Sequence, residues 1–559
     1  MSYKTDLLYD TEPISDLRDM LNKSVAARGE NTAFLTKEKG GDEYTRVSYN
    51  KFNNDINALG TRLLDMGMGG KHIAVIGENR YEWAVTYLAV VNGVGVIVPL
   101  DRELPDFEIK NLLIAGECEM IIYSRKKADT INAVKAELPG LKHYICMDGG
   151  FAELLSQGAE LIKNGNTAYA DVEIDRDAMC SLLFTSGTMG LAKGVMLSHK
   201  NLTANLFNMR KHILLDKNDI FLSVLPLHHT YECTCGFLCP LCGGSAIAYC
   251  EGLRHIQKNL VESRATIMLG VPLIFEGMYN KILAAAEKEG MLKKLKTAIK
   301  INYITKAVGV DLSSKFFASI YNSFGGCIRY LISGAAAMDP VVSKGLRDLG
   351  ITLLQGYGLT ECSPIVAVNK DRKFRDDSAG IPLPCFDIKI DNPNYEGIGE
   401  IAVRGDAVTV GYYKNEEATS QVMIGGWFHT GDLGRMDKDD FLYITGRKKN
   451  MILTSNGKNV YPEELESYLS KNDEILESFV YGKKNEKTGD IDICAEIVPD
   501  FEYYGETGDE GIKSDIEGIV KKLNAVMPVY KKINKVNIRR EEFEKTSTRK
   551  IKRYKVNTN

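Results

Sequence analysis

The sequence predicts an α/β protein with a large N-terminal domain of packed mixed and parallel sheets with helices, followed by a smaller α+β domain. Its 559 residues exceed what one hydrophobic core holds. Short apolar runs alternate with helix-like segments up to about residue 440, which is typical of a mostly parallel sheet covered on both faces. From Gly446 onward the segments become shorter and lysine is more frequent. We therefore expect domains at residues 1–446 and 447–559.

Hydrophobic periodicity predicts the individual elements of the large domain. Helices are expected at 53–66, 254–263 and 340–349, and strands at 72–77, 120–124, 266–272 and 329–334. The most apolar segment, AVTYLAVVNGVGVIVPL, contains Thr, Asn, two Gly and a Pro. It is also short for a membrane span, so we interpret it as a buried helix followed by a buried strand.

Composition limits the cellular setting and the partners. The net charge of −4 gives no basic field for nucleic acid. The charged N-terminus has no apolar signal core, and twelve cysteines without an export signal indicate reduced thiols in a cytoplasm. Residues 521–553 hold 12 Lys/Arg against 3 Asp/Glu. This basic tail is expected to be a solvated face, with peripheral contact to lipid at the inner membrane face as the alternative.

Four cysteines, in YECTCGFLCPLCGG, have a spacing that resembles a zinc site. They are Cys233, Cys235, Cys239 and Cys242. Their neighbours are apolar, and free cysteine packs as a small hydrophobe. We expect these cysteines to line a packed helix, and a zinc site remains the alternative.

The stretch FTSGTMGLAKGV (184–195) is typical of a loop that binds phosphate. Its glycines let backbone amides approach an anion, its hydroxyls add donors, and Lys193 adds a positive charge. An apparent strand at 179–184 precedes the loop and an apparent helix at 201–209 follows it, which favours a polyphosphate ligand. Six residues separate Gly187 from Gly194, where a Walker A loop has four between its glycines, so a P-loop ATPase is disfavoured.

This stretch resembles the phosphate loop of the adenylate-forming superfamily, and further motifs follow in the family's order. They are VLPLHHTYE (224–232), LISGAAAM (331–338), LQGYGLTE (354–361), WFHTGDLG (427–434), YITGRKKNMILTSNGKNVYPEELE (443–466) and EKTSTRKIKR (544–553). The double histidine and the SNGKNVYPEELE wording are similar to the fatty acyl-CoA synthetase branch.

The resemblance implies an ATP-dependent ligase that uses Mg²⁺ and has coenzyme A as co-substrate. A medium- to long-chain fatty acid would form an acyl-AMP with release of pyrophosphate, and coenzyme A would then displace AMP. Two other hypotheses remain: an acyl-AMP ligase that loads a carrier-protein thiol, and a nucleotide sensor without catalysis. The sequence leaves the acid, the acceptor and the oligomeric state open.

In the large domain, the resemblance assigns the triphosphate, adenine and acid sites. Glu361 would hold Mg²⁺ together with a hydroxyl at Thr185, since Mg²⁺ prefers oxygen ligands. Tyr357 would stack on adenine, and His229 would lie at the mouth of the acyl channel. The residues assigned to nucleotide or coenzyme A are Thr185, Ser186, Gly187, Thr188, Gly190, Lys193, Gly334, Ala335, Gln355, Gly356, Tyr357, Gly358, Thr360, Asp432, Arg447 and Gly457.

Asp432, near the end of the large domain, would accept both ribose hydroxyls, and Arg447, at the start of the small domain, would reach the ribose or phosphate. Lys550 would bridge the acyl carboxylate and the α-phosphate during adenylation. The family swings this mobile domain about a hinge, here Lys449, after which Gly457 would lie against the pantetheine arm. The catalytic set is therefore Lys550, His229, Thr185 and Glu361, with Thr185 and Glu361 also as metal ligands.

The sequence departs from the family pattern at three positions. Met189 stands where Thr or Ser is usual, and Ala192 replaces the usual Pro. Arg549 replaces the usual Gly before Lys550, and arginine would be strained there if the turn needs a positive φ. These departures concern the dynamics of the loop and the rate of adenylation.

Overall fold

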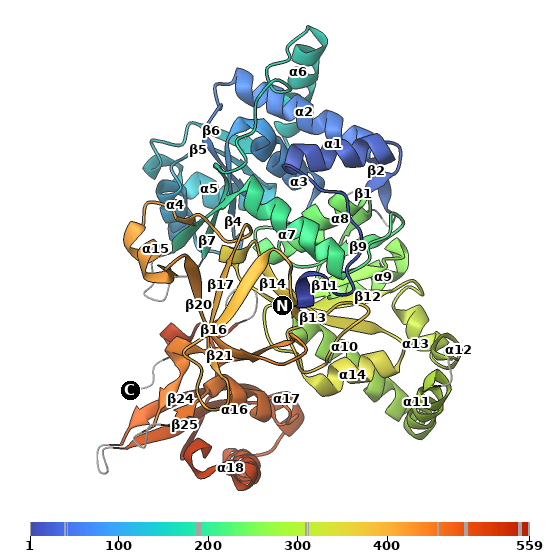
Figure 1. Cartoon of the computed structure of the whole chain (residues 1–559), viewed down its shortest axis with the longest axis vertical. Helices are drawn as coiled ribbons and strands as arrows, with labels where there is room; N and C mark the ends of the chain where they lie inside the picture. Colours follow the sequence, from blue (N-terminus) through green and yellow to red (C-terminus); the bar gives the residue numbers. More distant parts are fainter. Residues whose placement is uncertain are drawn as a thin grey trace. The chain divides into compact units, whose positions relative to one another are not determined.

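A computed structural model of the chain describes residues 2–37, 41, 43–185, 192–307, 310, 312–454, 458–485, 490–545 and 550–556. The backbone divides into two units (Figure 1). The larger contains Met1–Asp387, Arg404–Phe428 and Asp439–Phe441, and the smaller contains Ile388–Val403, His429–Lys438 and Leu442–Asn559. The α/β class predicted from the sequence is confirmed. The domain boundary at 446/447 stays a prediction.

A nine-stranded mixed sheet forms one half of the larger unit. Its order is β15-β14-β13-β12-β11-β9-β10-β1-β2. The bounds in that order are Ile381–Pro382, Ile365–Val368, Thr352–Gly358, Tyr330–Ser333, Ile267–Gly270, Ile220–Ser223, Ala246–Tyr249, Thr32–Thr36 and Thr45–Ser48. The strands from β13 to β1 are parallel, and antiparallel strands close both ends.

A seven-stranded sheet forms the other half of this unit, with the order β18-β8-β7-β4-β3-β5-β6. The bounds in that order are Gly411–Tyr412, Lys193–Ser198, Met179–Thr185, Val96–Leu100, His72–Ile76, Cys118–Tyr123 and His143–Cys146. The strands from β7 to β6 are parallel, whereas β8 is antiparallel to β7 and β18 is antiparallel to β8. The central strand β4, VIVPL, is apolar and buried at every position, as expected for a sheet buried on both faces.

Helices connect and cover these strands (Figure 1). They are α1 (Leu17–Arg28), α2 (Tyr49–Asp65), α3 (Tyr81–Ala89), α4 (Asp106–Ala115), α5 (Ala128–Val134), α6 (Phe151–Lys163), α7 (His199–His212), α8 (Cys239–Gly243), α9 (Ile256–Ser263), α10 (Pro272–Lys288), α11 (Leu292–Ala307), α12 (Ser313–Phe316), α13 (Ala318–Ser323), α14 (Pro340–Asp348) and α15 (Glu416–Val422). The apolar segment at 84–100 is the end of α3, a π-turn and β4, which confirms the helix-then-strand interpretation.

The smaller unit is α+β. Its three-stranded sheet has the order β24 (Ile475–Lys484), β25 (Ile491–Pro499) and β26 (Lys535–Ile538), with β22 (Ile452–Leu453) and β23 (Asn459–Val460) as a separate pair. Helices α16 (Pro462–Leu469), α17 (Phe501–Tyr504) and α18 (Asp509–Val526) complete it. The buried side of α18, including Ile516, packs against Val480 and Ile493 of the sheet. This core belongs to the smaller unit alone.

A further sheet has the order β16-β17-β20-β19, and β21 pairs with β20. Its strands are β16 (Phe386–Asp391), β17 (Gly399–Gly405), β19 (Met423–Ile424), β20 (Trp427–Met436) and β21 (Leu442–Arg447). Within the smaller unit, the β20–β21 ladder aligns Asp432 with Arg447. Two residues assigned to the nucleotide are therefore direct cross-strand neighbours.

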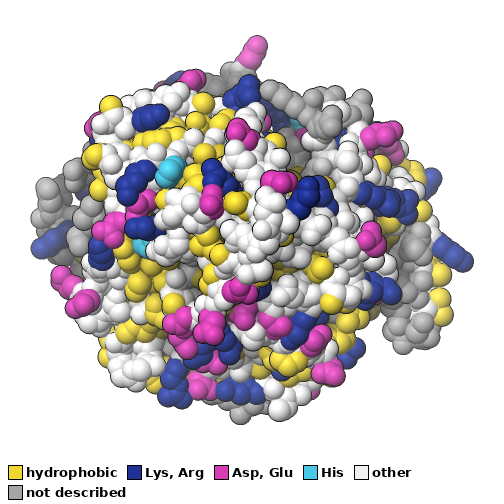
Figure 2. All heavy atoms as spheres, turned by 90° about the horizontal axis from the view of Figure 1, so that it is seen from above, with side chains coloured by type: hydrophobic (Ala, Val, Ile, Leu, Met, Phe, Trp, Pro, Cys, Tyr) yellow, Lys and Arg dark blue, Asp and Glu magenta, His cyan; other side chains and the backbone are white. Residues whose placement is uncertain are grey.

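On the face drawn in Figure 2, Lys and Arg side chains are interspersed with Asp and Glu, and no broad area carries one sign. This mixture agrees with the small net charge of −4. Among the helices that the structure describes, none combines the length and the apolar character needed to cross a bilayer.

Candidate functional site

The phosphate-loop stretch joins two antiparallel strands of the larger unit. β7 ends at Thr185 and β8 begins at Lys193, and these two residues are cross-strand partners. The Thr185 hydroxyl donates to the Lys193 carbonyl oxygen over 3.4 Å. The predicted helix is α7, but it follows β8 rather than the loop itself. The helix therefore does not follow the loop directly along the chain, in contrast to a Walker A loop.

Four of the assigned loop residues lie outside the described residues. They are Ser186, Gly187, Thr188 and Gly190, together with the departure at Met189. Ala192 is described as exposed coil just before β8. The assigned roles of these residues stay predictions.

One tyrosine connects Lys193 with Glu361, the acid assigned to magnesium. The Lys193 ammonium lies 4.9 Å from the centre of the Tyr412 ring. The Tyr412 hydroxyl donates a hydrogen bond of 2.8 Å to Glu361 Oε1. Tyr412 is 7% exposed, so little water competes for this bond. Lys193, which is assigned to the phosphates, and Glu361, which is assigned to magnesium, thus both contact the Tyr412 side chain.

Pairing of β18 with β8 places Tyr412. Tyr412 is opposite Val195, and the Tyr413 amide donates to the Gly194 carbonyl over 2.7 Å. The Thr409 amide donates to the Glu361 carbonyl, also over 2.7 Å. The contacts with β8 join segments more than 200 residues apart, and sequence reasoning missed Tyr412. No motif or spacing in the sequence pointed to it.

The two segments assigned to adenine end neighbouring parallel strands. β12 is followed by Gly334 and Ala335, and β13 contains Gln355 through Gly358. Ser333 and Gln355 are in register, so both segments reach the same edge of the sheet. Ala335 has a φ of +71°, a left-handed conformation that is uncommon for a residue with a side chain. Ligands of α/β sheets bind at such carboxyl ends.

Gln355 is used by the protein framework. Its Oε1 accepts from the Met338 amide over 3.3 Å, and its Nε2 donates to the Asp376 carbonyl. These bonds fix the loop that follows Gly334. The assignment of Gln355 to nucleotide stays a prediction, as do those of Tyr357 and Thr360.

Gly358 carries the chain from β13 to the short helix η7 (Thr360–Cys362), which contains Glu361. A Cβ at Gly358 would lie 2.1 Å from the Pro364 carbonyl oxygen, so a side chain cannot fit. The Leu359 amide donates to that same carbonyl over 2.9 Å. The turn that holds Glu361 in place therefore depends on glycine.

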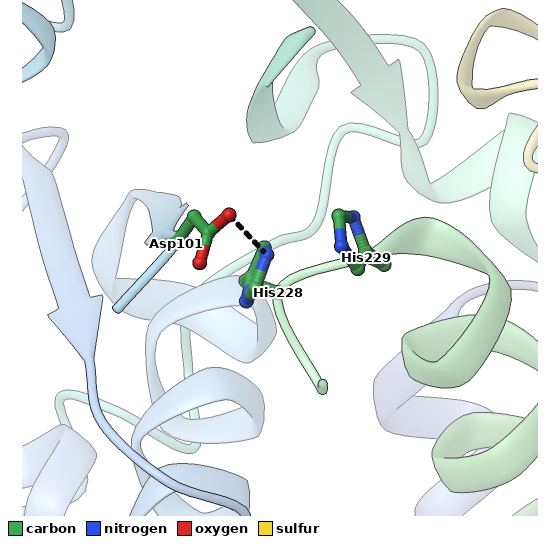
Figure 3. A group of neighbouring side chains, drawn as sticks. All are labelled: Asp101, His228 and His229. Atoms are coloured by element: carbon green, nitrogen blue, oxygen red, sulfur yellow. Dashed lines mark ion pairs between the residues drawn. The ribbon is translucent and has the colours of Figure 1, made fainter. Parts of the chain in front are cut away.

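The two histidines lie on a turn between β9 and the π-helix η5 (Tyr231–Leu238). Asn79 holds this turn: its Nδ2 donates to the Leu225 carbonyl over 2.7 Å, and its Oδ1 accepts from the Leu227 amide over 3.1 Å. Figure 3 shows Asp101, just after β4, facing His228, with His229 beside it at the start of the helix. Their ligand atoms all lie within 4.8 Å of one another.

Glu232 lies buried one turn beyond these histidines. The Ser223 hydroxyl donates to its Oε1 over 2.6 Å, and Oε2 has no hydrogen-bond partner. Burial raises the pKa of Glu232 to about 8, against the lowering effect of bonds from Ser223 and the Leu225 backbone. A protonated carboxyl group is therefore favoured at this position up to neutral pH.

The cysteine segment forms η5 and α8, as expected for a packed helix. All twelve cysteines of the chain are free. Burial raises the pKa of Cys233 and of Cys239 to about 12, so both are neutral thiols. Zinc is bound by thiolates. Among the residues that the structure describes, no group of metal-ligating side chains contains these cysteines.

The smaller unit brings Asp432, Arg447 and Lys550 together. Arg447 Nε lies 2.7 Å from Asp432 Oδ1, and Asp432 is 5% exposed. Desolvation lowers the pKa of Lys550, although the residue is exposed. Nearby Arg447 lowers it further, and Asp432 opposes the shift. The residues assigned to the ribose and to adenylation are thus electrostatic neighbours within one unit.

Lys449, the proposed hinge, belongs to the same cationic group. Desolvation lowers its pKa, Arg447 and Arg553 add to the lowering, and Asp432 and Glu463 oppose it.

Gly457 and Arg549 lie outside the described residues. Of the assigned residues, the structure therefore groups Thr185, Lys193 and Glu361 in the larger unit. It groups Asp432, Arg447 and Lys550 in the smaller unit.

Comparisons with known proteins cover nearly the whole chain. Residues 21–413 match the AMP-binding enzyme family, and residues 449–559 match the AMP-binding enzyme C-terminal domain. A mouse protein, long-chain-fatty-acid–CoA ligase 6 (Mus musculus), is 30% identical over 494 residues, covering 82% of this chain and 70% of its own. The peroxisomal long chain acyl-CoA synthetase 7 of Arabidopsis thaliana is 27% identical, covering 90% and 76%.

Among solved structures, the fold is similar to that of ATP-bound MatB from Rhodopseudomonas palustris. The TM-score is 0.76 at 23% identity, over 96% of this chain and 98% of that chain. At this identity the similarity establishes the fold alone.

Proposed function

Because the chain belongs to the AMP-binding enzyme family, in the fatty acyl-CoA synthetase branch of the adenylate-forming superfamily, we propose that this adenylate-forming ligase acts on a medium- to long-chain fatty acid. A carboxylate oxygen of the acid attacks the α-phosphorus of ATP, and the bond to the β-phosphate breaks with release of pyrophosphate. The thiol sulfur of coenzyme A then attacks the acyl carbon, loses its proton and displaces AMP.

The observation that carries the proposal is the contact of Lys193 and Glu361 with one residue, Tyr412. Two anions must meet in the first half-reaction, so the site has to neutralise negative charge and align the reacting groups. Lys193 neutralises phosphate, and Glu361 offers the oxygen ligand that Mg²⁺ prefers. The choice of a fatty acid is supported by the names of the relatives that align with most of the chain.

The remaining residues of the larger unit bind and orient the substrates. Thr185 offers a hydroxyl next to Lys193, and both bind the phosphates. Gly334, Ala335, Gly356 and Tyr357 end two adjacent strands and form the adenine site. His229 orients the carboxylate of the acid.

In the smaller unit, Asp432 accepts the ribose hydroxyls, and Arg447 keeps the Asp432 carboxylate in position. Lys550 places its ammonium on the developing phosphoryl charge. For the thiol step, the domain 447–559 turns about Lys449 and Gly457 leaves room for the pantetheine arm. A single arrangement cannot hold both Lys550 and a thiol at one adenylate, which supports a hinge mechanism.

We place the enzyme in the cytoplasm, where its twelve free thiols stay reduced. Its partners are small molecules: ATP, the acid and coenzyme A. Contact of the basic tail with lipid remains the alternative for the setting.

The experiment is a product assay over a panel of carboxylic acids from acetate to oleate, with aromatic acids included. Release of AMP is measured with and without coenzyme A. We expect AMP release to depend on both coenzyme A and a fatty acid of medium or long chain. AMP release only with a holo-carrier protein would favour the carrier-loading alternative. ATP binding without acid-dependent product would favour the nucleotide sensor.

A further inference from the structure

We propose that Asp101, His228 and His229 form a binding site for a divalent cation of the zinc class, separate from the magnesium that accompanies ATP. Among the residues that the structure describes, this is the one group of three or more such side chains close enough to share an ion. Two imidazoles and one carboxylate suit Zn²⁺ and Co²⁺ rather than Mg²⁺, which prefers oxygen ligands alone.

The first observation is a buried nitrogen without a hydrogen bond. The His228 side chain is 8% exposed, and its Nε2 makes no hydrogen bond. Buried polar atoms are almost always paired, and an ion is one of the explanations for an exception. Figure 3 shows this nitrogen directed at Asp101.

The second observation is the spacing. His228 Nε2 lies 3.5 Å from Asp101 Oδ2, which is longer than an ordinary hydrogen bond of about 2.7–3.2 Å. Two ligands that are each about 2.0–2.1 Å from a tetrahedral ion lie roughly 3.4 Å apart. The pair is therefore spaced for a shared cation. The rings of His228 and His229 have centroids 4.1 Å apart, and a ligand nitrogen of His229 lies within 4.8 Å of the other two ligand atoms.

The third observation is the support behind the ligands. Asp101 Oδ1 accepts from the Glu103 amide over 2.9 Å, which orients the carboxylate so that Oδ2 faces His228. Asn79 holds the turn that carries both histidines through bonds to the backbone of Leu225 and Leu227. Such fixed orientation of ligands by outer hydrogen bonds is characteristic of metal sites. All of these residues belong to the larger unit.

Three protein ligands leave a fourth position of a tetrahedral ion open to water or to a carboxylate. Under the proposed function, His229 orients the carboxylate of the acid, so a zinc-class ion would occupy the same side chain and compete with that role. The site is therefore inferred to be inhibitory, but its existence does not depend on the proposed function.

The test measures metal binding in the absence of ATP, Mg²⁺ and acid. Full-length protein, stripped of metal and kept reduced, is titrated with Co²⁺ and followed by visible absorption. We expect one tetrahedral Co²⁺ per chain with ligand-field bands and without thiolate charge-transfer absorption. Zn²⁺ should displace it and Mg²⁺ should not.

Two variants test the ligands. Asp101→Asn keeps the acceptor for the Glu103 amide, and His228→Phe keeps a buried ring. Each should weaken Co²⁺ binding at least about tenfold, because losing even an outer partner of a ligand typically costs 10–100-fold. His255→Ala, at an exposed histidine outside the group, is the matched control and should bind as the unaltered chain. Thermal melts establish that each variant is folded.

Co²⁺ affinity that is unchanged in both variants would overturn the proposal. Thiolate charge-transfer absorption would do the same, since it would assign the ion to cysteine. Absence of saturable binding would also overturn it. None of these results bears on acid-dependent AMP release, so failure here and failure of the proposed function are distinguishable.

Discussion

Substitution Tyr412→Phe removes one hydroxyl from the point where Lys193 and Glu361 meet. The ring remains, so the contact of 4.9 Å with the Lys193 ammonium is kept. The hydrogen bond of 2.8 Å to Glu361 Oε1 is lost. The Glu361 carboxylate can then rotate away from the position in which it would hold Mg²⁺.

The magnitude follows from the burial and charge of this contact. A hydrogen bond to a charged group contributes about 1.5–3 kcal/mol, and Tyr412 is 7% exposed, so water replaces the hydroxyl poorly. Since each 1.4 kcal/mol corresponds to about tenfold in rate or affinity, we expect kcat/KM for MgATP to fall about 10- to 100-fold. The loss should be smaller for Tyr412→Phe than for Glu361→Gln, which removes the ligand charge itself.

The assay is acid-dependent pyrophosphate release at varied MgATP, and the neighbouring tyrosine provides a matched control. The Tyr413 hydroxyl donates to Glu117 Oε2 over 2.7 Å in an exposed position, where such contacts contribute about 0–1 kcal/mol. Tyr413→Phe should therefore change kcat/KM by no more than about fivefold. Equal effects of the two substitutions, or an unaltered MgATP dependence in Tyr412→Phe, would refute the reasoning that Tyr412 positions Glu361.

Three further predictions concern Lys550, Asp432 and Glu232. Lys550→Ala should slow adenylate formation by about two to three orders of magnitude, while supplied acyl-AMP should still react with coenzyme A. Rapid-quench kinetics measures the rate of each half-reaction separately. An equal loss of rate in both half-reactions would count against separate roles. Asp432→Asn leaves Arg447 without its charged partner 2.7 Å away and should raise the KM for ATP about tenfold or more, whereas an unchanged KM would remove Asp432 from the ribose site. Burial raises the pKa of Glu232 from an ordinary 4.5 to about 8. Its contribution to the free energy of unfolding is therefore complete below about pH 4.5 and is lost as the pH rises toward 8. The urea concentration at the midpoint of unfolding, measured at about pH 5 and pH 8.5, should therefore change less in Glu232→Gln than in the unaltered chain. The same change with pH in both proteins would contradict a buried, protonated Glu232.

The sheet strands of the larger unit could be predicted because their signal is local. The run at 72–77 is apolar at every buried position and corresponds to β3, His72–Ile76. The segment at 84–100 could be divided into a helix and a strand because Gly and Pro interrupt an otherwise apolar run. Burial on both faces leaves this signature in any parallel sheet.

The hairpin around the phosphate loop was not predicted, because β8 has little signal of its own. Lys193–Ser198 contains only three strongly apolar residues, and its strand character depends on pairing with β7 on one side and β18 on the other. The sequence pattern therefore indicated a loop followed directly by a helix. Strand preference depends on such neighbours more than helix preference does.

Motifs indicated the candidate site residues, whose roles stay predictions, but gave no signal for the residues that support them. Tyr412 and Asp101 reach their positions through sheet pairing and through strand ends, at separations of more than 50 and more than 120 residues from Glu361 and His228. No spacing rule connects residues so far apart. The structure adds these partners and leaves the assigned roles to be tested.

The most direct test of the central claim is exchange of labelled pyrophosphate into ATP, measured with each acid in turn and without coenzyme A. Formation of an acyl-AMP is reversible and needs no thiol, so the account predicts exchange that appears only when a fatty acid of suitable chain length is added. Exchange that stays at the acid-free background for every carboxylic acid would contradict the claim that this site joins an acid to the α-phosphate of ATP.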